Sequence, residues 1–291
     1  MRFAFGEPFG VHHAIKIKII IMMKKVILIT GISSGFGKQT AGLLADKGHT
    51  VYGTVRRDVE ISSKVIGLKM DLVNADSIRQ AVQTVIRKEG KIDVLINNAG
   101  MHIGGPIETS PMEYIRLQMD TNFIGTVNLT KEVLPVMRSN GGGTIINFSS
   151  MGGLLGLPYQ GIYSAAKFAI EGFSEALRME VRQFNIKVVL INPSDFRTNN
   201  SANRRNFLAP TGPDDPYYKQ YEKTLAVIEK DEANGWEPVV LARKLVKIVE
   251  CKNPRNRYTI ATFISKLAIT LKHILPGKLF SRLLGYFYGI Y

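Results

Sequence analysis

The sequence has one cysteine and one tryptophan among its 291 residues, and it has no run of about eighteen apolar residues. A single cysteine, Cys251, cannot form a disulfide within the chain, which fits a reducing compartment. The missing apolar run argues against a membrane-spanning helix. With 45% hydrophobic and 21% charged residues, the chain has the composition of a globular protein, and we predict one large domain located in the cytoplasm.

Acidic residues are scarce, since 24 of them oppose 38 lysines and arginines for a net charge of +14. The imbalance is greatest from Leu241 to Tyr291, which contains ten basic residues and a single acidic residue, Glu250. Such asymmetry indicates a partner surface. No nucleic-acid-binding motif accompanies the charge, and the basic residues alternate with aliphatic ones at helical spacing. We therefore predict no nucleic-acid partner and favour peripheral contact with an anionic membrane.

Residues 1–22 do not match the rest of the chain, because a strand-like start at Met23 reads as the natural beginning of a domain. Lys16 and Lys18 interrupt the preceding apolar stretch, and no small-residue cleavage site follows it, so we do not predict a signal peptide. We expect residues 1–22 to be a leader outside the folded core, either from a misassigned start codon or as a disordered tail. The domain then covers residues 23–261, and a basic amphipathic segment covers residues 262–291.

Strand-like and helix-like segments alternate along the domain, which predicts a doubly wound parallel α/β sheet of about seven strands with helices on both faces. The predicted strands are Lys25–Thr30, Thr50–Val55, Ile66–Lys69, Ile92–Ile96, Thr144–Phe148, Lys187–Ile191 and Arg257–Ala261. The predicted helices are Phe36–Lys47, Asp76–Lys88, Pro111–Met137, Gly161–Phe184, Tyr217–Asp231 and Val239–Glu250. Between them, the polar stretch Asn192–Pro216 predicts a mobile functional loop over a ligand crevice.

A glycine-rich turn, Thr30–Gly37, joins the first strand to the first helix. Such a turn lets the backbone approach a pyrophosphate, and the helix N-terminus supplies amide donors and a favourable dipole. At the end of the second strand, Arg56 and Arg57 stand where a ribose-binding carboxylate would indicate NAD. Arginines there suit a 2′-phosphate, so the sequence favours NADP(H) over NAD(H). No metal site is predicted.

Tyr163 and Lys167 are four residues apart in a predicted helix, and Ser150 precedes Tyr163 by thirteen residues. Positions i and i+4 share a helix face, so the ammonium group can lie beside the phenol. A fixed positive charge favours the phenolate and lowers the tyrosine pKa toward neutrality, where it can transfer protons. Alone, the same pair also fits an ordinary surface contact.

With these motifs in order, the chain resembles the short-chain dehydrogenase/reductase family over roughly Lys24 to Tyr258. Thr30–Gly37 is similar to its T-G-x-x-x-G-x-G turn, and residues 97–100 match its N-N-A-G element. The resemblance implies a single-domain Rossmann fold and a catalytic tetrad of Asn122, Ser150, Tyr163 and Lys167. In that tetrad Tyr163 transfers the proton, Ser150 orients the substrate oxygen, Lys167 binds the nicotinamide ribose and Asn122 holds a water that links Lys167 to solvent.

The resemblance also implies which residues contact the cofactor, beside Arg56 and Arg57. They are Gly31, Ser33, Ser34, Gly35, Phe36, Gly37, Asp71, Leu72, Asn98, Ala99, Gly100, Tyr163, Lys167, Pro193 and Thr198. One departure is Pro193-Ser194, where the family usually has Pro-Gly, and it leaves the path of that loop open. Many relatives pair through helices like Pro111–Met137 and Gly161–Phe184, which implies a homodimer or homotetramer.

Residues 150–159 are similar to the corresponding segment of 17β-hydroxysteroid dehydrogenase-like members, which act on lipophilic alcohols and ketones. Apolar residues after Ile260 form one helical stripe, Pro276-Gly277 breaks it, and aromatic residues end the chain. The stripe suits a membrane interface, but packing on the domain or a substrate lid fits it equally. We expect NADPH-dependent reduction of a lipophilic ketone, steroid-like or long-chain, with 3-ketosphinganine as a candidate. The alternative is an NADP-binding sensor without turnover.

Overall fold

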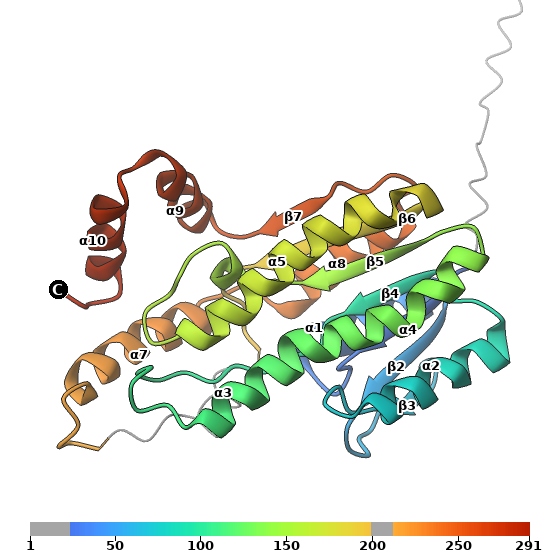
Figure 1. The fold of residues 1–291 in the computed structure, drawn as a ribbon, viewed down its shortest axis with the longest axis horizontal. Coiled ribbons are helices and arrows are strands. Elements are labelled where there is room, and N and C mark those ends of the chain that lie inside the picture. The colour runs from blue at the N-terminus through green and yellow to red at the C-terminus, as the bar shows by residue number, and fades with distance from the viewer. Residues whose placement is uncertain (1–23, 199–211) are drawn as a thin grey trace, which may run out of the picture.

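The computed structural model describes residues 24–198 and 212–291 and contains one seven-stranded sheet in which all paired strands are parallel (Figure 1). The strand order is β3-β2-β1-β4-β5-β6-β7. The bounds are β1 Val26–Thr30, β2 Thr50–Val55, β3 Ile66–Lys69, β4 Val94–Asn97, β5 Gly143–Phe148, β6 Ile186–Pro193 and β7 Arg257–Ile260. Strands β1 and β4 are buried throughout, as expected when helices cover both faces of a parallel sheet.

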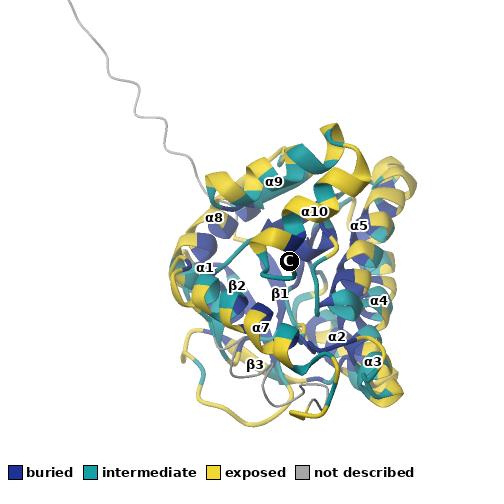
Figure 2. Ribbon diagram, turned by 90° about the vertical axis from the view of Figure 1, so that its left-hand side faces the viewer, coloured by how far each residue is buried: buried dark blue, intermediate teal, exposed yellow. Residues whose placement is uncertain are grey.

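Helices cover the sheet from two sides, with α1 and α8 on one side and α4 and α5 on the other (Figure 2). The helices are α1 Gly35–Asp46, α2 Ala75–Glu89, α3 Met112–Met119, α4 Gly125–Ser139, α5 Gly161–Val181, α7 Tyr218–Ala233, α8 Pro238–Glu250, α9 Phe263–Ile274 and α10 Gly277–Phe287. Two apolar clusters fill the spaces between the layers, one including Ile29, Leu44 and Leu245 and the other including Leu28, Val82 and Leu129. The predicted single-domain Rossmann-like architecture is confirmed.

The predicted helix Pro111–Met137 differs from the observed one, because a π-helical segment, η1 (Asp120–Ile124), separates α3 from α4. A π-helix makes i to i+5 hydrogen bonds, and it is frequent at functional sites. The side chain of Asn122 lies within it. The apolar period of the sequence does not reveal this change, since η1 continues the helix axis without a breaking residue.

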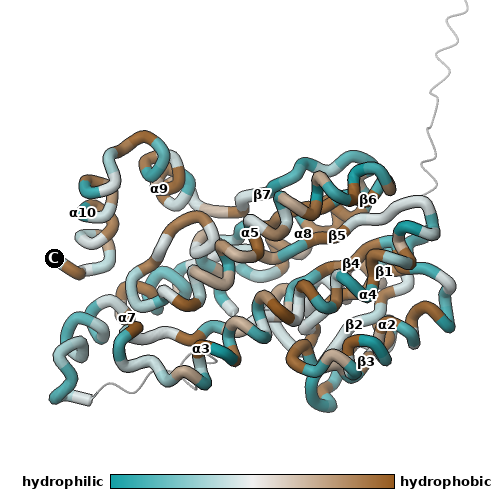
Figure 3. Tube along the Cα trace, in the orientation of Figure 1, coloured by the Kyte–Doolittle hydropathy of each residue, from teal (hydrophilic) through white to brown (hydrophobic). Residues whose placement is uncertain are grey.

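The predicted leader, residues 1–22, lies outside the described residues, and so do residues 199–211 of the predicted loop. The C-terminal segment forms α9 and α10, separated at Pro276 as predicted. Both helices lie beyond the carboxyl ends of the strands, on the same side as α7 (Figure 1), and hydrophobic and hydrophilic stretches alternate along them (Figure 3). In the part of the chain that the structure describes, no helix is both long and apolar enough to cross a membrane.

Candidate active site

A cavity of about 540 Å³ lies at the carboxyl ends of the strands. The turn after β1 and the loops after β4, β5 and β6 line it, and α9 and α10 line it from the side of the C-terminal segment. In open α/β sheets this crevice, where the strand order reverses beside β1, is the usual place for a ligand. The cavity therefore brings the glycine turn and the Tyr163 motif to one space.

Two glycines let the first turn pack as tightly as it does. Gly31 has φ of +71°, and a Cβ atom there would lie 2.9 Å from Ala99. A Cβ atom on Gly37 would lie 2.1 Å from the carbonyl oxygen of Gly31. The Asn98 side chain donates to the carbonyls of Thr30 and Gly31 at 2.8 and 3.1 Å. The turn is thus fixed against the end of β4, with the N-terminus of α1 beside the cavity.

The tyrosine of the predicted pair, Tyr163, lies in the first turns of α5 and lines the cavity. The ring of buried His102 stacks on it with centroids 4.1 Å apart and planes 19° from parallel. Gly152 lies against the same ring, since a Cβ atom there would lie 3.1 Å from its Cε1. These contacts restrict how the tyrosine can turn.

Lys167 is buried one turn after Tyr163, and its Nζ lies 5.8 Å from the centre of the Tyr163 ring. The Nζ donates to the carbonyl of Phe148 at 2.9 Å. Burial lowers the pKa of Lys167 to about 8, and the carboxylate of Glu171 opposes that shift. At neutral pH the ammonium form therefore still prevails beside the tyrosine.

Asn122 lies behind Lys167 rather than in the cavity wall. A Cβ atom on Gly100 would lie 3.2 Å from Oδ1 of Asn122 and 3.7 Å from Nζ of Lys167, so the three residues meet. The Asn122 side chain accepts from the Met101 amide at 2.7 Å and donates to the Met101 carbonyl at 2.8 Å. It thereby fixes the chain segment just after β4.

Ser150 follows β5 and caps a short 3-10 helix, Met151–Gly153, by accepting from the Gly152 amide at 3.1 Å. Its carbonyl accepts from the side chain of Asn192 at 3.2 Å. Ser150 and Tyr163 both line the cavity. The neighbouring Ser149 lines it too, but it is buried with only 2% of its surface exposed.

The C-terminal segment supplies an apolar wall to the same cavity. The contributing apolar residues are Ile264, Leu267, Ala268 and Leu271 of α9 and Phe280, Leu283, Leu284 and Phe287 of α10. Lys272 fastens α9 to the domain, because its Nζ donates to the carbonyl of Leu154 at 2.5 Å and lies 4.7 Å from the centre of the Phe168 ring. The inner face of α9 and α10 therefore agrees with the alternative in which the apolar stripe forms a substrate lid.

An acidic group also lines the cavity, consisting of Asp195, Asp231 and Glu232. Burial, followed by the charges of Asp231 and Glu232, raises the pKa of Asp195 to about 6. Burial and the same carboxylates raise the pKa of Tyr288, another lining residue. The charges of Asp231 and Glu232 thus add to burial in disfavouring the ionised form of Asp195.

Comparison with known proteins agrees with this geometry. Residues 25–209 match the short chain dehydrogenase family. The chain belongs to this family. It is 48% identical over 269 residues to the 3-ketodihydrosphingosine reductase of Bacteroides thetaiotaomicron, which covers 92% of this chain and all of that one. It is 34% identical to YusZ, an uncharacterized oxidoreductase of Bacillus subtilis, covering 90% of this chain and 98% of YusZ.

Solved structures give the same fold. A short-chain dehydrogenase from Streptomyces avermitilis has a TM-score of 0.73 at 28% identity, covering 87% of this chain and 93% of its own. One from Burkholderia cenocepacia in complex with NADP has a TM-score of 0.69 at 23% identity, covering 90% and 98%. Short-chain dehydrogenases are oxidoreductases that bind nicotinamide cofactors. The specific likeness to the 17β-hydroxysteroid branch stays a prediction.

Most of the residues predicted for this site line the cavity. They are Gly31, Ser33, Ser34, Gly35, Phe36, Arg56, Asp71, Leu72, Asn98, Ala99, Gly100, Ser150, Tyr163, Lys167, Pro193 and Thr198. Three predicted residues do not line it: Gly37 packs under the turn, Arg57 is exposed beside Arg56, and Asn122 lies behind Lys167. The roles predicted for all of these residues, whether or not they line the cavity, stay predictions.

Ser194 has an ordinary backbone conformation at the end of β6. Among described residues other than glycine, only Tyr159 and Asn185 have positive φ, so Ser194 needs no glycine-like backbone. Its amide donates to the carbonyl of Ile260 at 3.1 Å. Beyond it, Phe196 lines the cavity and contacts Trp236 edge to face, with ring centroids 5.8 Å apart.

The sequence did not predict several lining residues, and the polar ones among them include His102, Asp195, Asp231 and Glu232. His102 had one usable signal, its place two residues after the N-N-A-G element. Asp195 follows Pro193 by two residues inside the predicted loop and had the same kind of signal. Asp231 and Glu232 had none, because they reach the cavity from α7, whose position depends on tertiary packing.

Proposed function

We propose that the protein catalyses NADPH-dependent reduction of a lipophilic ketone to a secondary alcohol. The observation that carries the proposal is the single cavity in which Tyr163, Lys167 and Ser150 lie between a glycine turn and an apolar wall. The glycine turn fits a dinucleotide, since Gly31 and Gly35 line the cavity at the N-terminus of α1. The apolar wall fits a lipophilic ligand.

The chain's own residues supply proton transfer and orientation. When bound, the nicotinamide cofactor supplies a hydride for the carbonyl carbon. Tyr163 donates its phenolic proton to the carbonyl oxygen, and the Ser150 hydroxyl donates a hydrogen bond to the same oxygen as negative charge develops there. Lys167, held by the Phe148 carbonyl, stabilises the phenolate that remains. The stack with His102 holds the phenol in place.

NADP(H) is favoured over NAD(H) by the residues at the end of β2. Arg56 lines the cavity there and is exposed, so its guanidinium can form a bidentate contact with a 2′-phosphate. Arg57 is its exposed neighbour and adds positive charge. Similar folds occur with NADP and with NAD, so the preference rests on these arginines.

The proposed substrate is 3-ketosphinganine, the same compound as 3-ketodihydrosphingosine. One support is the relative from Bacteroides thetaiotaomicron that carries this activity in its name. A second is chemical: the compound joins an alkyl chain to a ketone and a neighbouring ammonium group. The apolar wall suits the chain, and the buried carboxylate of Asp195 suits the ammonium. A steroid ketone has no cation for this carboxylate.

A substrate panel tests the function. Purified protein with NADPH is given 3-ketosphinganine, its N-acetyl derivative, a ketosteroid and retinal, and the nicotinamide absorbance is followed. We expect 3-ketosphinganine to be reduced with the highest kcat/KM, and the uncharged N-acetyl derivative to lose about tenfold or more. Turnover of none of them would contradict the ketoreductase proposal and favour the NADP-binding sensor. Equal turnover of the amine and its N-acetyl derivative would contradict the role of the acidic group.

Replacing Asp195 by Asn gives a readout that does not depend on turnover. The folded-state pKa of Asp195 is raised to about 6. The ionised carboxylate therefore lowers the free energy of unfolding as pH rises from about 4 to about 6, and the loss is complete above that pH. Asp195→Asn should therefore raise Tm at pH 7 and leave it unchanged at pH 4, while raising KM for the amine. An unchanged Tm at pH 7 would show that the ionised carboxylate of Asp195 does not destabilise the fold.

The outer face of the C-terminal segment supports the predicted membrane contact. Phe263 and Ile274 of α9 are 80% and 70% exposed, and no acidic residue follows Glu250. Exposed apolar groups beside Lys266 and Lys278 suit an anionic bilayer. Flotation with phosphatidylcholine vesicles, with and without phosphatidylglycerol, tests it. We expect binding only to the anionic vesicles, and its loss in a Phe263→Ser, Ile274→Ser double variant.

The predicted self-association also stays part of the proposal. Exposed apolar residues on the outer surface of α3 and α5, namely Met112 and Met179, are 57% and 74% exposed. Burial of these side chains against a second copy of the chain would stabilise a homo-oligomer. Light scattering coupled to size-exclusion chromatography measures the mass, and a monomer at all concentrations would contradict it.

A further inference from the structure

A buried carboxylate, Glu171, lies one helical turn beyond Lys167 on the same face of α5. Only 6% of its surface is exposed. A buried carboxylate destabilises a fold unless it is paired and hydrogen-bonded. Glu171 lies outside the predicted catalytic tetrad, and its two oxygens connect different parts of the site.

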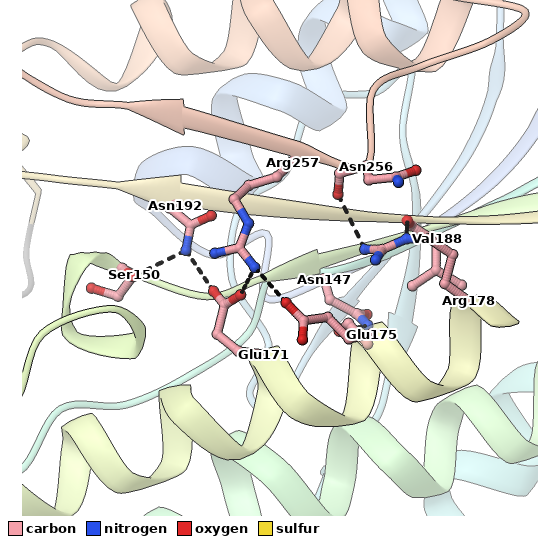
Figure 4. Close-up of polar contacts among 10 residues, drawn as sticks. Asn147, Ser150, Glu171, Glu175, Arg178, Val188, Asn192, Asn256 and Arg257 are labelled. Carbon is pink, nitrogen blue, oxygen red and sulfur yellow. Dashed lines mark hydrogen bonds and ion pairs between the residues drawn. The ribbon is translucent and has the colours of Figure 1, made fainter. Parts of the chain in front are cut away.

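One oxygen of Glu171 connects to the serine side of the site (Figure 4). The Asn192 side chain donates to Oε1 of Glu171 at 2.5 Å and to the carbonyl of Ser150 at 3.2 Å. Asn192 is fully buried in β6. Its amide therefore links the carboxylate to the backbone of Ser150.

The other oxygen of Glu171 connects to the far edge of the sheet. Nη2 of Arg257, the first residue of β7, lies 2.7 Å from Oε2 of Glu171 and 2.9 Å from Oε1 of Glu175. The two carboxylates differ in surroundings, because the Glu171 side chain is 8% exposed and that of Glu175 is 58% exposed. Arg257 thus supplies a positive charge in direct contact with the buried carboxylate of Glu171.

We propose that Glu171, held by Arg257 and Asn192, is a positioning residue that fixes Ser150 and keeps Lys167 positively charged. Other groups around Lys167 are Tyr163 on α5, Asn122 on η1 and the Phe148 carbonyl of β5, with His102 beyond the tyrosine. The carboxylate of Glu171, one helical turn from Lys167 on α5, supplies the negative charge that opposes the effect of burial on Lys167.

The groups that face Glu171 complete this account. Arg178, one helical turn after Glu175, donates to the carbonyls of Val188 and Asn256, and its pKa is lowered by burial. Arg257 is thus the cation in direct contact with Glu171, and Arg178 is directed to backbone oxygens. Only the kinetic tests of this inference depend on the proposed reaction.

Two changes at position 171 separate charge from length. Glu171→Gln keeps the size and removes the charge, so the pKa of Lys167 should fall by about one unit from about 8. The alkaline limb of the reduction rate then moves to lower pH by the same amount, with about a fivefold loss at pH 8 and little loss at pH 6. Glu171→Asp keeps the charge and shortens the side chain, so kcat should fall about tenfold while the alkaline limb stays in place.

Glu175→Gln is the matched control, since Glu175 meets the same guanidinium but lies at the surface. We expect it to change neither the pH profile nor kcat. A uniform loss of rate in Glu171→Gln with an unmoved alkaline limb would overturn the proposal. If that variant does not fold, a wild-type kcat in Glu171→Asp overturns it instead.

A substrate-free measurement separates this inference from the proposed function. Titration of ¹³Cε-lysine resonances, with the Lys167 signal assigned by its absence in Lys167→Arg, reads the ammonium directly. A lowered midpoint in Glu171→Gln supports the network even if no ketone is reduced. An identical midpoint overturns it whether or not the enzyme turns over.

Discussion

Two regions face each other across the cavity and are built differently. The side formed by the ends of β1, β4 and β5 is held by buried strands and short hydrogen bonds, such as those from Asn98 to the turn after β1. The side formed by α9 and α10 consists of amphipathic helices with many exposed apolar residues, fastened by contacts such as Lys272 with Leu154. The first holds reacting groups in fixed geometry, and the second offers an apolar surface to the cavity.

This contrast suggests a division of work. Proton transfer needs groups held within fractions of an ångström, which the sheet edge provides. Selection among lipophilic chains needs apolar area with little directional demand, which amphipathic helices provide. Changes in the first region should therefore reduce kcat, and changes in the second should raise KM.

The largest expected effect is that of Tyr163→Phe in the rigid region. Removing the phenolic proton should lower kcat by about 10²- to 10⁴-fold, while the ring keeps its stack with His102. NADPH affinity, measured by fluorescence titration, should stay within about twofold. Tyr159→Phe is the control, because that hydroxyl donates to Gln220 away from the cavity. Unchanged turnover in Tyr163→Phe would refute the mechanism.

A smaller effect is expected from a charge placed in the apolar wall formed by α9 and α10. Leu271 lines the cavity, whereas its neighbour Thr270 is exposed. Leu271→Asp should raise KM for 3-ketosphinganine by about 10- to 100-fold, because an unpaired carboxylate then meets the alkyl chain. Thr270→Asp introduces the same charge at an exposed position that does not line the cavity, and it should leave KM unchanged. A reduced kcat with normal KM in Leu271→Asp would remove the distinction between the two regions.

The smallest expected effect concerns the choice of cofactor. Arg56→Ser should lower the ratio of kcat/KM for NADPH to that for NADH by about tenfold, through loss of a charge-assisted contact. Arg57→Ser should lower it less, since Arg57 does not line the cavity. Rates with the two cofactors at equal concentration measure the ratio. If neither change affected the NADPH-to-NADH ratio, Arg56 and Arg57 would not be the basis of a preference for NADP.

The parts of the molecule that follow from local sequence were predictable. The buried apolar strands and the glycine turn depend on neighbouring residues, and the Tyr163–Lys167 spacing depends on helix geometry alone. The π-helical segment at Asn122 was not predictable, because the apolar period runs through it unchanged. Contacts between distant segments were also hidden: Lys272 and Leu154 are 118 residues apart in the chain. The acidic group is hidden for the same reason, since it joins the loop after β6 to α7.

The single tryptophan has a practical consequence. Trp236 contacts Phe196, and Phe196 lines the cavity. Tryptophan emission overlaps the absorption of reduced nicotinamide, so a bound NADPH should draw excitation from this one indole and re-emit it at longer wavelength. Because the sequence has no other tryptophan, the protein carries its own optical reporter, and cofactor arrival can be timed in a stopped-flow instrument without attaching a dye.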